Sequence, residues 1–157
     1  MGDKHRFDVF AKFIRSNFPP NKYINIADIA GGKGDLNKRL KIYGYKNIIT
    51  FDTKKNRKNK IIYKRKLFDE SINDNFDLLI GMHPDEATDV IINEAGKRKI
   101  PFAIVPCCIL PVTTNFNEKR NYINWCSHLK RFAESLNFIV GETSLDIKGK
   151  NHVIWGI

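Results

Sequence analysis

The sequence of 157 residues lacks any apolar run long enough to cross a bilayer, because a membrane-spanning helix needs about 20 consecutive apolar residues. Its N-terminal segment is amphipathic and charged, without the apolar core of a secretory signal. We therefore expect no membrane partner and an intracellular protein, either cytoplasmic or nuclear. The length suits one compact domain over 1–157, with 1–20 contributing an N-terminal helix that packs on it.

Cysteine is scarce, and its pattern excludes two common kinds of small protein. The three cysteines are Cys107, Cys108 and Cys126. An odd number without a secretory signal argues against a disulfide framework. No pair has the Cys-x-x-Cys spacing of a structural zinc site, so we expect no metal site.

Acidic residues are few relative to basic ones, 17 against 27, which leaves a formal net charge of +10. Such an excess favours a polyanionic partner, with RNA the first candidate. The densest basic run comprises Lys54, Lys55, Arg57, Lys58 and Lys60. Lysine is frequent throughout the chain, however, so a compositional bias that fills solvated surface positions is the alternative explanation.

The most informative segment is a glycine-rich turn, AGGKG, between a predicted strand over 23–30 and a predicted helix over 35–42. Glycine lets the backbone pass close to a ligand. Asp52 ends the next predicted strand and can accept hydrogen bonds from ribose hydroxyls. We interpret the segment as a βαβ unit that holds a nucleotide-like cofactor. The complete G-x-G-x-x-G spacing of dinucleotide-binding proteins is absent.

Hydrophobic periodicity predicts the remaining elements. Helices are expected over 4–17, capped by Asp3, and over 85–97 and 118–136. Further strands are expected over 47–52, 61–67, 76–81, 102–105, 138–147 and 152–157. Alternating strands and helices predict an α/β fold with a doubly wound, mostly parallel seven-stranded sheet. The last two strands predict an antiparallel C-terminal hairpin.

From about residue 22 to the end, this layout resembles the class I S-adenosylmethionine-dependent methyltransferases, a Rossmann-like fold. The turn DIAGGKG resembles the first motif of that family, and Ala30 stands where the family usually has its first glycine. The resemblance implies S-adenosylmethionine as cofactor. It also implies that the cofactor-binding residues are Asp28, Ala30, Gly31, Gly32, Lys33, Gly34, Asp52, Phe68, Asp69, Gly81 and Met82.

Within that family, three features resemble one subgroup, which includes a eukaryotic tRNA ribose methyltransferase. They are the Gly-Lys-Gly turn, the histidine His83 and the Pro-Cys-Cys block that contains Cys107 and Cys108. This resemblance implies an RNA substrate by analogy alone, because fold and cofactor do not set the substrate. The chain is small, so a partner protein is expected to supply substrate recognition.

The candidate catalytic residues His83, Asp85 and Cys107 follow the predicted strands over 76–81 and 102–105. These strands are neighbours in this fold, so both segments border one cleft. His83 either accepts a proton from the methyl acceptor or only stabilises its turn. Asp85 also fits as an N-cap. The thiols of Cys107 and Cys108 line the pocket, act as a nucleophile, or hold a metal together with His83.

The sequence thus predicts a methyltransferase that transfers a methyl group from S-adenosylmethionine to RNA, tRNA or rRNA, or to a protein side chain. The alternative is a non-catalytic subunit that binds the cofactor or RNA. A nicotinamide-dependent oxidoreductase is a third candidate, which the glycine spacing and the terminal hairpin disfavour.

Overall fold

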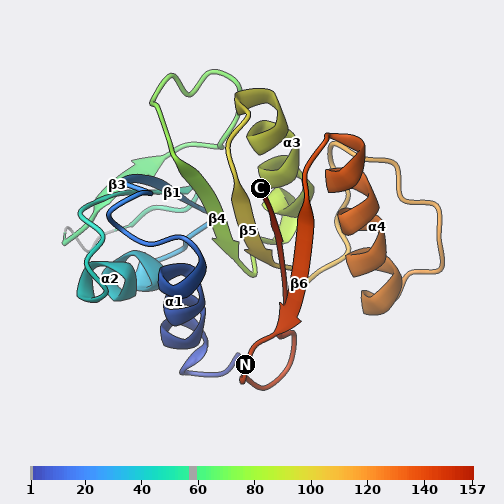
Figure 1. Ribbon diagram of the computed structural model, residues 1–157, viewed down its shortest axis with the longest axis horizontal. Coiled ribbons are helices and arrows are strands. Elements are labelled where there is room, and N and C mark those ends of the chain that lie inside the picture. Colours follow the sequence, from blue (N-terminus) through green and yellow to red (C-terminus); the bar gives the residue numbers. More distant parts are fainter. Residues whose placement is uncertain (1, 57–59) are drawn as a thin grey trace.

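The computed structural model describes residues 2–56 and 60–157 (Figure 1). Within these residues seven strands form one sheet in the order β3-β2-β1-β4-β5-β7-β6. The strands are β1 (Asn25–Ile29), β2 (Asn47–Asp52), β3 (Ile62–Arg65), β4 (Leu78–Met82), β5 (Phe102–Val105), β6 (Val140–Ser144) and β7 (His152–Gly156). The strand order reverses at β1, with β4 on its other side, which is where ligands bind in open α/β sheets.

The first five strands are parallel, whereas β7 pairs antiparallel with both β5 and β6. Strand β4 is buried along its whole length because both of its faces are covered. The predicted fold class is confirmed: this is a doubly wound, mostly parallel sheet of seven strands with an antiparallel C-terminal hairpin.

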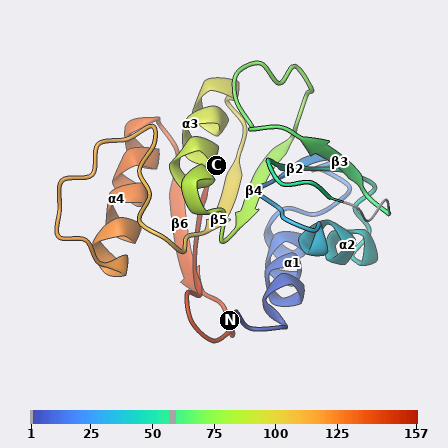
Figure 2. The ribbon, with the colours of Figure 1, turned by 180° about the vertical axis from the view of Figure 1, so that it is seen from behind.

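Two layers of helices sandwich the sheet, as Figures 1 and 2 show from opposite sides. Helices α1 (Arg6–Asn17) and α2 (Asp35–Ile42) cover one face, where Phe10 and Leu40 join the core. Helices α3 (Thr88–Arg98) and α4 (Tyr122–Ser135) cover the other, where Ile91 and Trp125 are fully buried. Each predicted helix therefore exists, because each carries an apolar stripe at helical spacing.

Several predicted boundaries are wrong, and the capping residues explain two of them. Helix α1 has His5 as its N-cap, and the Asp3 carboxylate instead accepts a hydrogen bond from the His5 amide within the preceding turn. Helix α4 starts at Tyr122, because the Asn121 side chain caps it by accepting from the Asn124 amide.

The edge strand β3 is shorter than predicted, four residues in place of seven. Its residues are mostly exposed. It pairs with β2 on one side, and on the other side no strand of the described part of the chain pairs with it. A charged, exposed edge strand offers little apolar surface to extend the pairing. The run of basic residues between β2 and β3 lies partly outside the described residues, since Arg57 and Lys58 fall there.

The turn between β6 and β7 lies beside the N-terminus (Figure 1). The Lys148 amide donates a hydrogen bond to the Asp3 carboxylate, 3.0 Å away. This contact joins the N-terminal segment to the β6–β7 turn. None of the described helices is long and apolar enough to span a membrane.

Candidate functional site

Two adjoining cavities lie at the carboxyl ends of the parallel strands. The larger measures about 560 Å³ and is lined by Ile29, Ala30, Gly32, Phe51, Asp52, Thr53, Lys54, Lys66, Leu67, Phe68, Pro84, Asp85, Glu86, Ala87, Cys108 and Leu110. The smaller measures about 360 Å³ and is lined by Arg6, Phe7, Asp28, Ala30, Gly31, Gly32, Lys33, Asp35, Leu36, Met82 and His83. Ala30 and Gly32 border both, so the glycine-rich turn forms the boundary between the cavities.

The turn itself requires glycine at Gly31. A Cβ atom there would lie 2.3 Å from a carboxylate oxygen of Asp28 and 2.6 Å from the methyl group of Thr50. The next glycines have left-handed backbone, with φ of +56° at Gly32 and +77° at Gly34. Gly34 is the N-cap of α2 and borders neither cavity. Its part in the site is to direct the chain from the turn into the helix.

Ala30 also has left-handed backbone, with φ of +55°. This conformation is unfavourable for a residue with a Cβ atom. Ala30 lines both cavities, so its side chain borders the space on each side of the turn.

Asp52 lies at the end of β2 and lines the larger cavity. One carboxylate oxygen accepts a hydrogen bond from the Gly32 amide at 2.8 Å, and the other accepts from the Lys54 amide at 2.9 Å. The carboxylate therefore fixes the glycine-rich turn against β2. Each oxygen has a second lone pair with which to accept a further hydrogen bond from the cavity side.

Asp28 is fully buried beneath the glycine-rich turn. The side-chain amide of Asn37 donates to the Thr50 hydroxyl, which donates in turn to one Asp28 oxygen. The other oxygen of Asp28 is buried and has no hydrogen-bond partner among residues 2–56 and 60–157. Burial raises the pKa of Asp28 to about 7. The hydrogen bond from Thr50 acts in the opposite direction and lowers this pKa, but its effect is smaller.

The predicted residues after β3 occupy different places. Phe68 lines the larger cavity and packs edge-on against Phe51. Asp69 borders a neighbouring cavity of about 610 Å³, and its carboxylate accepts from the amide and the hydroxyl of Ser71. The Asp69 side chain thus closes its own loop and does not border the larger cavity.

The two predicted residues at the end of β4 also separate. Met82 lines the smaller cavity. Gly81 packs against α3, because a Cβ atom there would lie 2.6 Å from Ile91 and 3.0 Å from Pro84. The absence of a side chain at Gly81 lets α3 approach the sheet.

His83 connects the end of β4 to the C-terminal hairpin. Its Nε2 lies 2.8 Å from the Lys150 carbonyl oxygen, and its backbone is left-handed, with φ of +53°. A carbonyl oxygen only accepts, so Nε2 carries the proton and donates it. Burial lowers the pKa of His83, which favours the neutral ring. This hydrogen bond agrees with the alternative that His83 stabilises its turn, and the ring also lines the smaller cavity.

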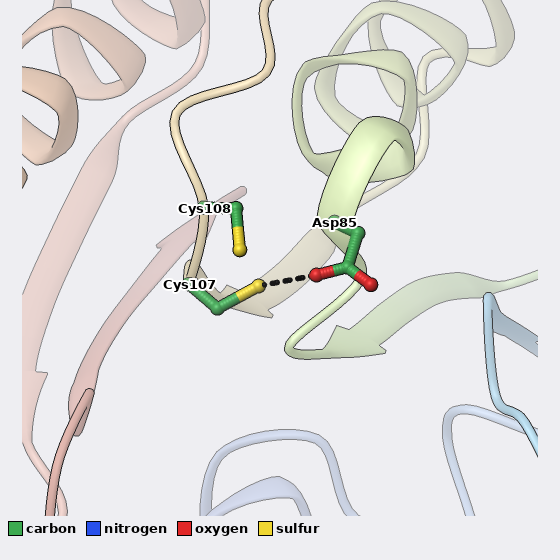
Figure 3. A group of neighbouring side chains, drawn as sticks. All are labelled: Asp85, Cys107 and Cys108. Carbon is green, nitrogen blue, oxygen red and sulfur yellow. Dashed lines mark hydrogen bonds between the residues drawn. The ribbon is translucent and has the colours of Figure 1, made fainter.

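Asp85 and the two neighbouring cysteines converge above the ends of β4 and β5 (Figure 3). The expectation that Asp85 caps a helix is wrong, because its side chain makes no capping bond and accepts instead from the Cys107 thiol at 3.0 Å. Burial, together with this contact, raises the pKa of Cys107 to about 12. Cys107 is therefore a protonated thiol in this arrangement, which does not favour a nucleophilic role.

The sequence interpretation missed Asp89, a fully buried residue in the first turn of α3. One of its carboxylate oxygens accepts hydrogen bonds from three successive amides, those of Val112, Thr113 and Thr114, at 2.8 to 3.1 Å. These bonds hold the segment after Cys108 against α3. An acidic residue in the first turn of a helix is common, so no local signal distinguishes this one.

The sequence interpretation also missed Arg6, which enters the smaller cavity from the start of α1. Arg6 and Lys33 are the basic residues in the lining of this cavity, and Asp28 and Asp35 are the acidic ones. The larger cavity carries Lys54 and Lys66. Pairing α1 with the glycine-rich turn depends on tertiary packing, which the sequence pattern alone does not specify.

No family model matches this sequence, and no curated protein matches it. Solved structures match its fold. A ribosomal protein L11 methylase from Lactobacillus delbrueckii subsp. bulgaricus aligns with 100% of this chain and 81% of its own, at 11% identity and a TM-score of 0.71. A SAM dependent methyltransferase from Aquifex aeolicus aligns over 98% and 93% of the two chains, at 13% identity and a TM-score of 0.60.

A third structure is a 1,6-didemethyltoxoflavin-N1-methyltransferase from Burkholderia thailandensis with bound S-adenosylhomocysteine. It aligns over 98% of this chain and 77% of its own, at 10% identity and a TM-score of 0.63. At such identities the likeness concerns the fold. The chain therefore has the Rossmann-like fold that these S-adenosylmethionine-dependent methyltransferases share.

Proposed function

We propose that this protein is a methyltransferase that uses S-adenosylmethionine. The observation that carries the proposal is the pair of adjoining cavities that meet at Ala30 and Gly32, one mainly apolar in its lining and one with basic and acidic residues in its lining. S-adenosylmethionine has the same division, since an adenosine is joined through a sulfonium to an amino acid. When bound, it supplies an electrophilic methyl group.

The larger cavity suits the adenosine. Phe51 and Phe68 offer aromatic surface for an adenine ring, and Leu67 adds exposed apolar surface. Asp52 offers carboxylate oxygens to ribose hydroxyls, while its existing bonds to Gly32 and Lys54 hold it in place. Buried aromatic surface would supply most of the affinity, and the carboxylate would supply orientation.

The smaller cavity suits the amino-acid part. Arg6 and Lys33 can bind a carboxylate, and the acidic residues Asp28 and Asp35 can attract an ammonium group. An ammonium group beside Asp28 would favour the ionised carboxylate and lower its pKa. The presence of both basic and acidic residues in this cavity thus suits a zwitterion.

Methyl transfer would take place beside the ends of β4 and β5. The enzyme must orient the acceptor in line with the sulfonium and, where the acceptor loses a proton, supply a base. With Nε2 donating to the Lys150 carbonyl, the neutral ring of His83 carries its lone pair on Nδ1. His83 is our candidate base. Asp85 lines the larger cavity, whereas Cys107 lines neither cavity and donates its thiol hydrogen bond to Asp85.

The acceptor we propose is RNA, as in the tRNA and rRNA modifying enzymes, with a partner protein contributing recognition. The net charge of +10 supports it, as do Lys54 and Lys55, which follow β2 on the same edge as the cavities and are exposed. Lysines there would bind phosphates without reading bases. A protein side chain is the alternative acceptor.

Transfer of a labelled methyl group tests the proposed activity. Purified protein is incubated with S-adenosylmethionine carrying tritium in the methyl group, together with total RNA or total protein of a matching cell extract. We expect label in RNA with the wild type and with Asp77→Asn, but not with Asp52→Asn. Asp77 is a matched control because its carboxylate also accepts from two backbone amides, at the opposite edge of the sheet. Label in protein but not in RNA would contradict the proposal that RNA is the methyl acceptor. Label in neither would favour the alternative that the protein is a non-catalytic subunit.

A further inference from the structure

The geometry points to a metal site formed by Asp85, Cys107 and Cys108, which takes a thiophilic divalent cation of the zinc class. One ligand atom from each residue lies within 4.8 Å of the other two (Figure 3). Among residues 2–56 and 60–157, this is the group of three His, Cys, Asp or Glu side chains whose ligand atoms all lie within 4.8 Å of one another. From the sequence we expected no metal site, because no pair of cysteines has Cys-x-x-Cys spacing. In the fold, the sheet brings Asp85 close to Cys107 and Cys108, which are distant from it in the sequence.

Sheet pairing holds the ligands in position. Strands β4 and β5 are paired with Met82 opposite Val105, and the His83 amide donates to the Val105 carbonyl at 3.0 Å. Both ligand segments therefore leave the sheet at one level. The Thr88 hydroxyl donates to the Asp85 carbonyl at 2.7 Å and fixes the turn that carries the carboxylate.

The distances suit a tetrahedral ion. Zinc binds thiolate sulfur at about 2.3 Å and carboxylate oxygen at about 2.0–2.2 Å, so its tetrahedral ligands lie roughly 3.5–3.8 Å apart. The Cys107 sulfur and the Asp85 oxygen are 3.0 Å apart, and no ligand atom is more than 4.8 Å from another. Adjustments of about an ångström through side-chain rotation would complete the site. In Figure 3 both sulfur atoms point toward the space beside the carboxylate.

The donor set selects the metal. Two thiolates and one carboxylate favour zinc or a similar borderline ion over magnesium or calcium, which prefer oxygen ligands throughout. On binding, each thiol transfers its proton to solvent, so two thiolates and one carboxylate give the divalent site a net charge of −1. Three protein ligands leave a fourth position open. Asp85 and Cys108 line the larger cavity, so the metal site borders the cavity proposed for the adenosine.

His83 is not part of this set, because its Nε2 is directed at the Lys150 carbonyl. Cys126 lies apart from the cluster in the buried face of α4. It is therefore an internal control: a thiol of the same chain that the proposed site does not use.

Cobalt(II) binding tests the site. The full-length protein is freed of metal, kept reduced, and titrated with Co²⁺, which reports thiolate ligation through charge-transfer absorption and tetrahedral geometry through visible bands. We expect both signals to saturate at one Co²⁺ per chain and to be displaced by Zn²⁺. The double variant Cys107→Ser with Cys108→Ser should lose the charge-transfer band, Asp85→Asn should weaken binding, and Cys126→Ser should match the wild type.

Folding of each variant is checked by thermal unfolding without metal, so that a lost signal is not a lost fold. Absence of a charge-transfer band in the folded wild type would overturn the site. A band that persists in the double serine variant, or that disappears in Cys126→Ser, would also overturn the site. The experiment contains no S-adenosylmethionine, so its outcome is independent of the proposed methyl transfer.

Discussion

At the residue scale, Ala30 is the position where the sequence departs from glycine in a turn that needs left-handed backbone. An L-residue with a side chain pays about 1–2 kcal/mol for that conformation, whereas glycine loses about 0.5–1 kcal/mol through its greater freedom in the unfolded chain. We predict that Ala30→Gly increases the free energy of unfolding by about 0.5–1 kcal/mol, measured by urea denaturation.

The matched control is Ala27→Gly in β1, where the alanine is fully buried in a strand. There the same change removes a packed methyl group and gains no relief of strain, so we predict a loss of about 1–2 kcal/mol. Equal losses in the two variants would show that the backbone at Ala30 is not strained.

A second prediction at this scale concerns the ionisation of Asp28. Its folded pKa is raised from 3.8 to about 7, so between about pH 4 and 7 the folded protein keeps a proton that the unfolded chain releases. Stability relative to Asp28→Asn therefore falls as pH rises through that window and levels off above it. The full change is at most about 4 kcal/mol. Denaturation of both proteins as a function of pH measures it.

Carboxyl-carbon NMR titration identifies the group directly. Thr50→Val removes the hydrogen bond that lowers the Asp28 pKa, so the titration of Asp28 should move to higher pH. A titration that moves to lower pH, or a stability difference that rises between pH 4 and 7, would contradict the buried, unpartnered state of this carboxyl group.

At the element scale, Asp89 joins α3 to the segment that follows Cys108. Three amides depend on one of its oxygens, and hydrogen bonds to a charged group contribute about 1.5–3 kcal/mol each before coupling between them. We predict that Asp89→Ala lowers the free energy of unfolding by about 3 kcal/mol or more. Amide hydrogen exchange at 112–114 should become faster in the same variant.

Asp69→Ala is the control for this prediction. Asp69 is exposed, and its carboxylate accepts hydrogen bonds from Ser71 in its own loop, so we predict a loss below about 1 kcal/mol. If the two variants lose the same stability, Asp89 does not anchor the segment after β5.

Elements with strong periodicity were predictable from the sequence. Helix α2 and strand β5 have the predicted bounds, because a short apolar stripe and an apolar run each end at clear signals. The start of α4 was not predictable from the sequence, because other polar residues before Asn121 are equally plausible N-caps. The role of Asp85 was not predictable either, because its hydrogen-bond partner Cys107 is distant in the sequence.

At the scale of the whole molecule, the excess of positive charge leads to a prediction about RNA. Lys54 and Lys55 follow β2 at the edge that carries the cavities, whereas Lys46 and Lys99 shortly precede β2 and β5 at the opposite edge. If the first pair contacts phosphates, Lys54→Gln with Lys55→Gln should weaken RNA binding. It should also reduce the slope of log affinity against log salt by about 1–2.

The control, Lys46→Gln with Lys99→Gln, removes the same charge from the far edge. Binding is measured by fluorescence anisotropy with a labelled single-stranded RNA over a range of salt concentrations. Equal effects of the two double variants would indicate that RNA responds to net charge alone, which would favour the compositional explanation of the lysines.

The sequence also placed the site at this edge of the sheet, since the glycine-rich turn and Asp52 must meet there in any βαβ unit. Individual contacts depended on tertiary packing. The approach of Arg6 from α1 could not be predicted, and neither could the bond between His83 and Lys150, because each joins segments that no local pattern relates.

Binding of S-adenosylmethionine by the two cavities underlies the proposed function, and calorimetric titration with S-adenosylhomocysteine measures such binding without methyl transfer. We predict binding at one site per chain by the wild type and by Asp77→Asn, and loss of binding by Asp52→Asn, whose folding is verified by thermal unfolding. Absence of binding by the folded wild type would contradict the account, as would unchanged binding by Asp52→Asn. Binding of a reduced nicotinamide dinucleotide in its place would favour the oxidoreductase.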